Sequence, residues 1–231
     1  MDKKFTIPYG LVTATLLFCL LNFTTTVTIH RIFKIGFMQD NVAVLFFTLM
    51  FPLFDAITEV YKRKVAIFIF MTGNTMLVGI LLLISVALKL PPAPHPDAIS
   101  LILTTQVFET LFRQGFLLSV FAFIGVSVSM IINIVILQKL RYMLKGRQFI
   151  IRSVISSMIG EIPVTLAIYP FVYHQDPWAL ILLMMANSYA YKVVFSTITA
   201  PVAKLIVIAL RRADGIKDEF FNADLSRYAM R

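Results

Sequence analysis

The sequence predicts an all-α membrane protein, a polytopic bundle of six transmembrane helices with both termini in the cytoplasm. Composition, long apolar runs and the placement of positive charge lead to this prediction. The 231 residues are 59% hydrophobic and 14% charged, whereas soluble domains are about 45–50% apolar and about 25% charged. A soluble domain of this size could not cover so much apolar surface. Cys19 is the single cysteine, which excludes a disulfide framework and a cysteine-based metal site.

Six segments are long and apolar enough to cross the hydrocarbon core, which requires about 20 mostly apolar residues. They cover residues 8–29, 41–60, 65–88, 115–137, 149–173 and 178–203. Their apolar runs do not alternate with polar residues as barrel strands do, so helices are expected. Residues 101–112 are either the start of the fourth helix or a re-entrant or interfacial segment. We expect residues 1–210 to form the transmembrane domain and residues 211–231 a short cytoplasmic tail.

Lysine and arginine gather on one side of these segments. That side carries Lys3, Lys4, Lys62, Arg63, Lys64, Lys139, Arg141, Lys145, Arg147, Arg211 and Arg212, and the other side carries Arg31, Lys34 and Lys89. The positive-inside rule therefore predicts cytoplasmic termini. Since this asymmetry accounts for most of the net charge of +9, the expected partner is a lipid bilayer and not nucleic acid.

Charged residues inside the apolar segments are costly to insert and are the first candidates for a functional site. Asp55 and Glu59 are four residues apart, so both carboxylates share a helix face, with Thr58 beside it. The alternative for Glu59 is an interfacial helix end at which it pairs with Arg63.

Glu161 lies near the middle of the fifth segment, where Pro163 removes a backbone donor and frees the carbonyl of Ile159. A cavity-lining acid and a structural ion pair are both consistent with this position. Lys192 is also far from either end of its segment, so we expect it to pair with Glu161, Glu59 or Asp55.

Asn22 and Asn133 complete the predicted substrate-binding set of Asn22, Asp55, Glu59, Asn133, Glu161 and Lys192, although either asparagine could instead bond a neighbouring helix. A second tier contains Thr58, Arg113, Ser157, Asn187, Tyr189 and Tyr191. Arg113 could also pair with Glu109. The sequence has no protease, hydrolase or phosphate-binding motif in these segments, so we expect no enzyme, catalytic residue, metal or cofactor. Charges spread over several helices suit a substrate pocket better than a pore.

The run FPLFDAITEVY at residues 51–61 resembles the second-span signature F-P-x-x-D-x-x-T-E-x-Y-G of queuosine precursor transporters, also called the vitamin uptake transporter family. Further matches are Asn22, Arg113, the Arg152…Ser156-Ser157…Gly160 run, and Lys192 with Pro201. The chain departs from the family pattern at Lys62, where glycine is usual, and at Met130, where glutamine is usual. It also has Glu161 and Val164 in place of a glutamine or asparagine and a following aspartate.

The resemblance implies a bacterial inner-membrane protein that imports 7-deazaguanine bases for queuosine modification of tRNA. A carboxylate can accept the two adjacent N–H donors of such a base, and tyrosine or phenylalanine can stack on its ring. Two other functions stay open: a substrate-binding subunit of a vitamin importer energised by ATPase partners, and a non-transporting membrane assembly protein. The sequence leaves open which precursor is carried, the energy coupling and homo-oligomer formation.

Overall fold

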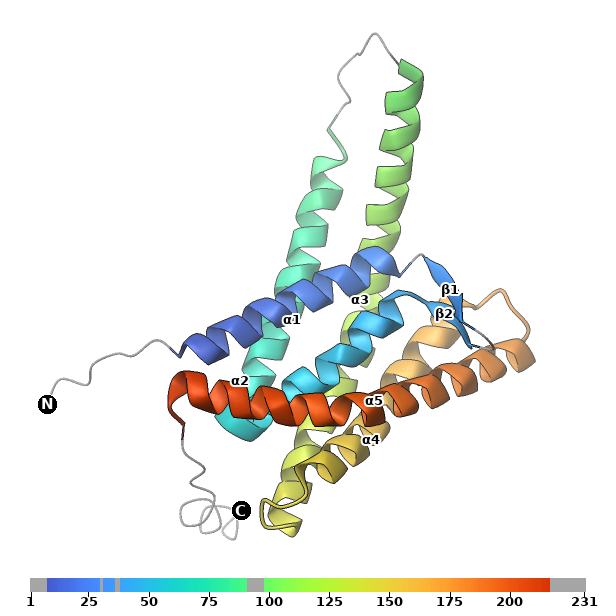
Figure 1. Cartoon of the computed structure of the whole chain (residues 1–231). Helices are drawn as coiled ribbons and strands as arrows, with labels where there is room; N and C mark the ends of the chain where they lie inside the picture. Colours follow the sequence, from blue (N-terminus) through green and yellow to red (C-terminus); the bar gives the residue numbers. More distant parts are fainter. Residues whose placement is uncertain (1–7, 30, 36–37, 91–97, 217–231) are drawn as a thin grey trace, which may run out of the picture.

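The computed structural model describes residues 8–29, 31–35, 38–90 and 98–216, which form a helical protein with one small β-hairpin (Figure 1). The helices are α1 (Tyr9–Thr28), α2 (Ala43–Ala87), α3 (Ala98–Met143), α4 (Phe149–Val172) and α5 (Trp178–Asp214). Within the described residues, five helices are long and apolar enough to cross a membrane. The predicted helical membrane class is therefore supported. The second and third predicted segments share the single element α2.

A break at Lys62 divides α2 into a first arm, residues 43–61, and a second arm, residues 63–87. Lys62 has φ 74° and ψ 161°, which are not helical values. Side chains rarely adopt this region of backbone space because the Cβ atom clashes, and glycine is its usual occupant. The resemblance noted above also has glycine at this position. The helix is therefore broken at a lysine, in a backbone conformation that favours glycine.

The first arm of α2 lies at the centre of the helix bundle. Every residue from Met50 to Val60 is buried, and α2 packs against α1, α3 and α5. A helix that is apolar on all sides belongs inside a protein, where each face has a neighbour to cover it. Phe54 anchors this packing, with its ring centroid 4.8 Å from that of Phe18 and 5.4 Å from that of Phe70. Any polar side chain on this arm must consequently find its partner on another helix.

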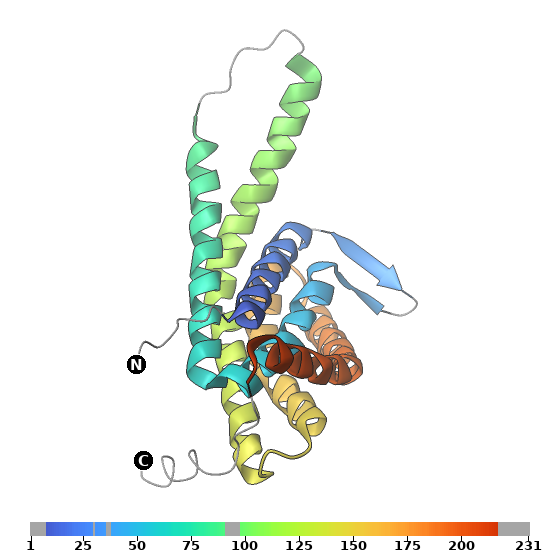
Figure 2. The ribbon, with the colours of Figure 1, turned by 60° about the vertical axis from the view of Figure 1, so that its left-hand side comes forward.

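The second arm of α2 and α3 form a long hairpin that projects beyond the other helices (Figures 1 and 2). Helix α3 is continuous from Ala98 to Met143, so residues 101–112 are the beginning of that helix and not a separate re-entrant segment. This is the first of the two alternatives considered from the sequence, in which the fourth helix begins before residue 115. Helix α5 likewise continues past residue 210 to Asp214 and ends at Gly215, which has φ 63°. Of the predicted tail, residues 217–231 lie outside the described part of the chain.

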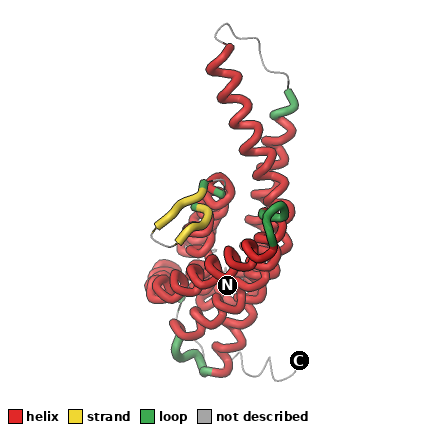
Figure 3. Tube along the Cα trace, turned by 90° about the vertical axis from the view of Figure 1, so that its right-hand side faces the viewer, coloured by secondary structure: helices red, strands yellow, loops and turns green. Residues whose placement is uncertain are grey.

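An antiparallel β-hairpin, β1 (Ile32–Ile35) and β2 (Met38–Asn41), connects α1 to α2 (Figure 3). The sequence does not predict this hairpin, because strands of four residues are too short to show a recognisable alternation. Ile32 is paired with Asn41, which places the end of β2 beside the beginning of β1. The side chain of Asn41 accepts a hydrogen bond of 3.1 Å from the backbone N–H of Val44 and so fixes the start of α2.

We predict that Lys62→Gly stabilises the protein, because glycine adopts φ 74° without the steric cost that lysine incurs. That cost is about 1–3 kcal/mol, and it exceeds the entropy of about 0.5–1 kcal/mol lost by introducing a glycine. The measurement is the thermal unfolding midpoint of the purified protein. Lys64→Gly is the matched control, since Lys64 is exposed and helical and its replacement should lower the midpoint. A midpoint lowered equally by both substitutions would contradict the prediction.

Candidate functional site

A partly enclosed cavity of about 100 Å³ lies where α1 ends and α2 begins. All five helices contribute to its wall, together with the end of β2. The lining residues are Asn22, Thr25, Thr26, Ile29, Asn41, Ala43, Val44, Phe47, Asn74, Leu77, Ser119, Ala122, Phe123, Val126, Val164, Ile168, Tyr169 and Lys192. We call this part of the molecule the cavity end. Mostly apolar walls with a few convergent polar groups are typical of small-molecule sites.

Lys192 is the single charged side chain among the described residues that line the cavity. Its ammonium donates a hydrogen bond of 3.1 Å to the hydroxyl of Thr165. The same ammonium lies 5.8 Å from the ring centroid of Phe47 and 5.9 Å from that of Tyr169, within the range of cation–π attraction. With 3% of its surface exposed, this cation is fixed in the wall and cannot extend to the membrane surface.

Two asparagines from different helices meet in the cavity wall. The Asn22 side-chain nitrogen lies 3.5 Å from the Asn74 side-chain oxygen, a weak hydrogen bond. The Asn74 nitrogen is buried and has no hydrogen-bond partner within the described part of the chain. An unmet buried donor costs about 1–3 kcal/mol, so it is available to a ligand that offers an acceptor. Asn22 was predicted from the sequence and Asn74 was not. Both are asparagines within an apolar run, so the pattern that indicated Asn22 also applied to Asn74.

Glu161 lies one helical turn before Val164, a lining residue, and its own side chain is fully buried. Neither carboxylate oxygen has a hydrogen-bond partner among the residues that the structure describes. Lys192 interacts electrostatically with Glu161. Glu161 is one of the three partners considered for this lysine from the sequence. Of the two residues, Lys192 lines the cavity and Glu161 does not.

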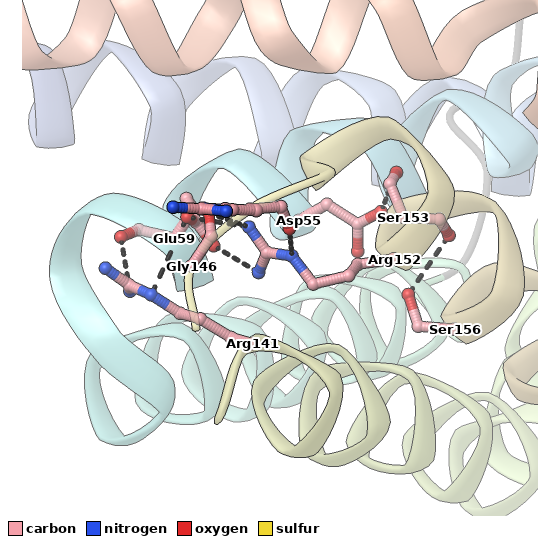
Figure 4. Close-up of polar contacts among 8 residues, drawn as sticks. Asp55, Glu59, Arg141, Gly146, Arg152, Ser153 and Ser156 are labelled. Carbon is pink, nitrogen blue, oxygen red and sulfur yellow. Dashed lines mark hydrogen bonds and ion pairs between the residues drawn. The ribbon is translucent and has the colours of Figure 1, made fainter. Parts of the chain in front are cut away.

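Asp55 is fully buried and belongs to a different polar cluster (Figure 4). One carboxylate oxygen accepts a hydrogen bond of 2.7 Å from the Asn133 side chain, and the other accepts a hydrogen bond from the hydroxyl of Ser153. Asp55 thereby joins α2 to α3 and α4. Neither Asp55 nor Asn133 is among the residues that line the cavity.

Glu59 pairs with two arginines at the end of the first arm of α2 (Figure 4). Arg152 donates from both terminal nitrogens to the two carboxylate oxygens, at 3.0 and 3.1 Å. Arg141 lies 3.6 Å from the same carboxylate and donates a 2.9 Å hydrogen bond to the Glu59 carbonyl. Interhelical arginines thus replace Arg63, the partner considered from sequence, because the arm is surrounded by α3 and α4. Arg152 itself was noted only as part of the family resemblance.

A third cluster ties together the start of α1, the break in α2 and the end of α5. The Asp214 carboxylate accepts hydrogen bonds from the backbone N–H groups of Gly10 at 2.6 Å and Leu11 at 3.2 Å. It also accepts a hydrogen bond from the hydroxyl of Tyr61, the residue before the break. A carboxylate at this position satisfies unpaired donors and complements the helix dipole. With Glu59, Arg141 and Arg152, this cluster marks the opposite end of the bundle, which we call the kink end.

The second-tier residues are dispersed. Thr58 and Ser157 are buried outside the cavity wall, and Asn187 is exposed on α5. Tyr189 donates a 3.0 Å hydrogen bond to the carbonyl of Met158, close to Glu161. The Tyr191 ring lies 5.8 Å from that of Phe195. Arg113 lies in α3, where the structure does not describe its side chain.

Of the predicted substrate-binding residues, the structure therefore brings Asn22 and Lys192 to the cavity, with Glu161 behind Lys192. Tyr169 and Phe47 were not singled out from sequence, because aromatic residues are too abundant in this chain to be informative one by one. The described residues contain no group of three histidine, cysteine, aspartate or glutamate side chains able to hold a metal ion. The arrangement can bind and orient a small planar molecule between aromatic rings, amides and one cation.

Residues 41–206 match a family model described as "Putative vitamin uptake transporter". The matched region begins at the end of β2 and includes the cavity residues of α2, α3, α4 and α5. No curated protein and no solved structure matches the chain.

We predict that Arg152→Leu strongly destabilises the protein, because Glu59 would lose both of its bidentate hydrogen bonds in a buried position. Removing one partner of a buried pair typically costs about 3–5 kcal/mol. The thermal unfolding midpoint measures the effect, and Arg147→Leu, at an exposed arginine, is the control. The double variant with Glu59→Gln should recover part of the loss. Equal midpoints for Arg152→Leu and Arg147→Leu would refute this role.

We also predict that Asp214→Ala weakens the first turn of α1, because Gly10 and Leu11 lose their acceptor. A lost helix cap costs about 1 kcal/mol. Hydrogen exchange of the amides at the start of α1 should accelerate, while exchange within α4 stays the same. Asp176→Ala, at an exposed turn residue, provides the control. Unchanged exchange in α1 would rule out the capping role.

Proposed function

The chain belongs to the vitamin uptake transporter family, and from this premise we propose that it imports queuosine precursors, the planar 7-deazaguanine bases, across the bacterial inner membrane. The observation that carries the proposal is the cavity into which all five helices project side chains. A site shared by every helix can be closed or opened by shifting any of them, as transport requires. An isolated structural ion pair would need no such space.

The proposed topology has six crossings, with the two arms of α2 as separate spans and both termini in the cytoplasm. The break at Lys62 supports this, since it lies in the basic run Lys62-Arg63-Lys64. Arg141 and Arg152, the start of α1 and the end of α5 belong to the same kink end. The positive-inside rule assigns that end to the cytoplasm. The cavity end then faces outward, where a nutrient would enter.

The chemistry of the wall suits a planar heterocycle. Phe47 and Tyr169 offer aromatic surfaces near the Lys192 ammonium, and base–aromatic stacking contributes about 1–3 kcal/mol per base. Asn22 and Asn74 offer amide groups that can read the edge of a ring. The hydroxyl oxygens of Thr25 and Thr26 would accept the N–H donors of the base, and Glu161, behind the wall, would hold the Lys192 ammonium in place electrostatically. Each polar group of the base would thus have a counterpart.

The polar clusters at the kink end would form the closed side of an alternating-access cycle. Glu59 with Arg152, and Asp214 with Tyr61, join the ends of separate helices on the side opposite the cavity. Release into the cytoplasm would require these contacts to separate while the cavity end closes. Rigid-body movement of one group of helices against another is the usual form of such a cycle.

We predict that Glu161→Ala and Lys192→Met abolish uptake of radiolabelled 7-deazaguanine into proteoliposomes, with reconstitution unchanged. Each substitution removes the electrostatic interaction between the two residues, and Lys192→Met also removes the one charged side chain that lines the cavity among the described residues. Lys204→Met, at an exposed lysine on the same helix, should transport like the wild type. Undiminished uptake by Glu161→Ala would exclude that residue from the site.

The same assay tests the function as a whole. Proteoliposomes that contain only this chain should accumulate or equilibrate the base without ATP. Uptake that appears only with co-purified ATPase partners would instead identify a binding subunit of an ATP-energised importer. Absence of both uptake and binding for every 7-deazaguanine would reject the proposed substrate class.

A further inference from the structure

The charges and donors of the cavity wall are unevenly distributed, and this unevenness constrains the ligand. Lys192, 3% exposed, carries the one charge on the wall within the described residues, and the acid that accompanies it, Glu161, is not a lining residue. A ligand in the cavity therefore meets the cation first. Because the site is mostly apolar and partly enclosed, this charge is poorly screened by water.

Asn74 adds a second donor from another helix. Its residue is 6% exposed, its side-chain oxygen already faces Asn22, and its nitrogen has no partner in the described chain. The amide therefore keeps an unmet N–H donor in the cavity wall. Thr25 and Thr26 differ, since their hydroxyls donate to the carbonyls of Leu21 and Asn22 on their own helix. Their oxygen lone pairs remain as acceptors on the α1 side.

We infer that Asn74 and Lys192 together select substrates by an electronegative edge: the cavity takes a planar ring with a carbonyl or carboxylate group and rejects rings that carry an ammonium group. The inference rests on the proposed function and names its specificity-determining residues. The ring carbonyl would face Asn74 and Lys192, and ring N–H groups would face the threonines of α1. A cationic substituent would be repelled by Lys192 and would leave the donor of Asn74 unmet.

Sites that hydrogen-bond a substrate group discriminate strongly against analogues that lack it, because their buried polar groups are left unpaired. The probes are therefore matched pairs, used on the full chain in nanodiscs with binding measured by thermal shift and by competition. In 2,6-diamino-7-deazapurine an amino group replaces the ring carbonyl of 7-deazaguanine. In 7-aminomethyl-7-deazaguanine an ammonium group is added. We expect 7-deazaguanine to bind at least about tenfold more tightly than either analogue.

The variant Asn74→Asp keeps the shape of the side chain and replaces its donor with an acceptor. This variant should bind 7-deazaguanine about tenfold more weakly than the wild type does, and it should bind the aminomethyl analogue more tightly. A gain of binding cannot result from misfolding, so this reversal is the decisive readout. Lys192→Met should remove the bias against the cationic analogue, whereas Lys204→Met should preserve it. Equal binding of all three bases by the wild type, or an unchanged preference in both cavity variants, would overturn the inference.

A second pair separates this inference from the substrate class. Nicotinate carries a carboxylate on a planar ring, and 3-(aminomethyl)pyridine carries an ammonium at the same position. If no 7-deazapurine binds but nicotinate does and its cationic counterpart does not, the proposed class is wrong and the selection by Asn74 and Lys192 holds. If the bases bind without regard to charge, the class holds and the selection is wrong. Binding of neither pair would refute both.

Discussion

The burial of residues 50–60 of α2 on every side is the constraint on which the rest of the structure depends. Because this part of the helix has no exposed face, the side chains of Asp55 and Glu59 must contact neighbouring helices. An unpaired charge in such a place would be prohibitive. The neighbours α3 and α4 must therefore supply Asn133, Ser153 and Arg152 at the matching heights. These interactions fix the rotation and depth of three helices, and the cavity inherits its shape from that arrangement.

The molecule separates its polar groups into two ends with opposite properties. At the kink end, the carboxylates of Glu59 and Asp214 are saturated by arginines, by backbone N–H groups and by Tyr61. Toward the cavity end, Glu161 and the amide nitrogen of Asn74 lack hydrogen-bond partners within the described residues. Saturated groups hold a conformation, whereas groups with unmet capacity gain from a ligand. The two ends are therefore suited to different parts of the proposed transport cycle, and the hydrogen bonds themselves distinguish them.

The sequence was sufficient for the class of the fold and for the residues that are unusual in a membrane. Apolar length predicted the helices, and the scarcity of charge made Asp55, Glu59, Glu161 and Lys192 conspicuous. Which of them meet could not be predicted, because side-chain partners on different helices depend on rotation about each axis. A rotation of one residue, about 100° in a helix, would move a side chain from the cavity to the lipid. Asn187 is exposed and Asn74 is buried for this reason. The break at Lys62 was hidden for a different reason, since lysine is not a residue that signals a positive φ.

The contact of Asp214 with the first turn of α1 has a consequence for the order in which the protein is made. The first helix is synthesised long before residue 214. Its N-terminal amides therefore have no Asp214 acceptor until the last helix has been made. Until then, the first-turn amides of α1 and the hydroxyl of Tyr61 lack this acceptor. Completion of the bundle is thus a single closing event that joins the oldest and newest parts of the chain. A nascent chain that stalls before α5 would lack both the cover that α5 gives to α2 and the Asp214 link at the kink end.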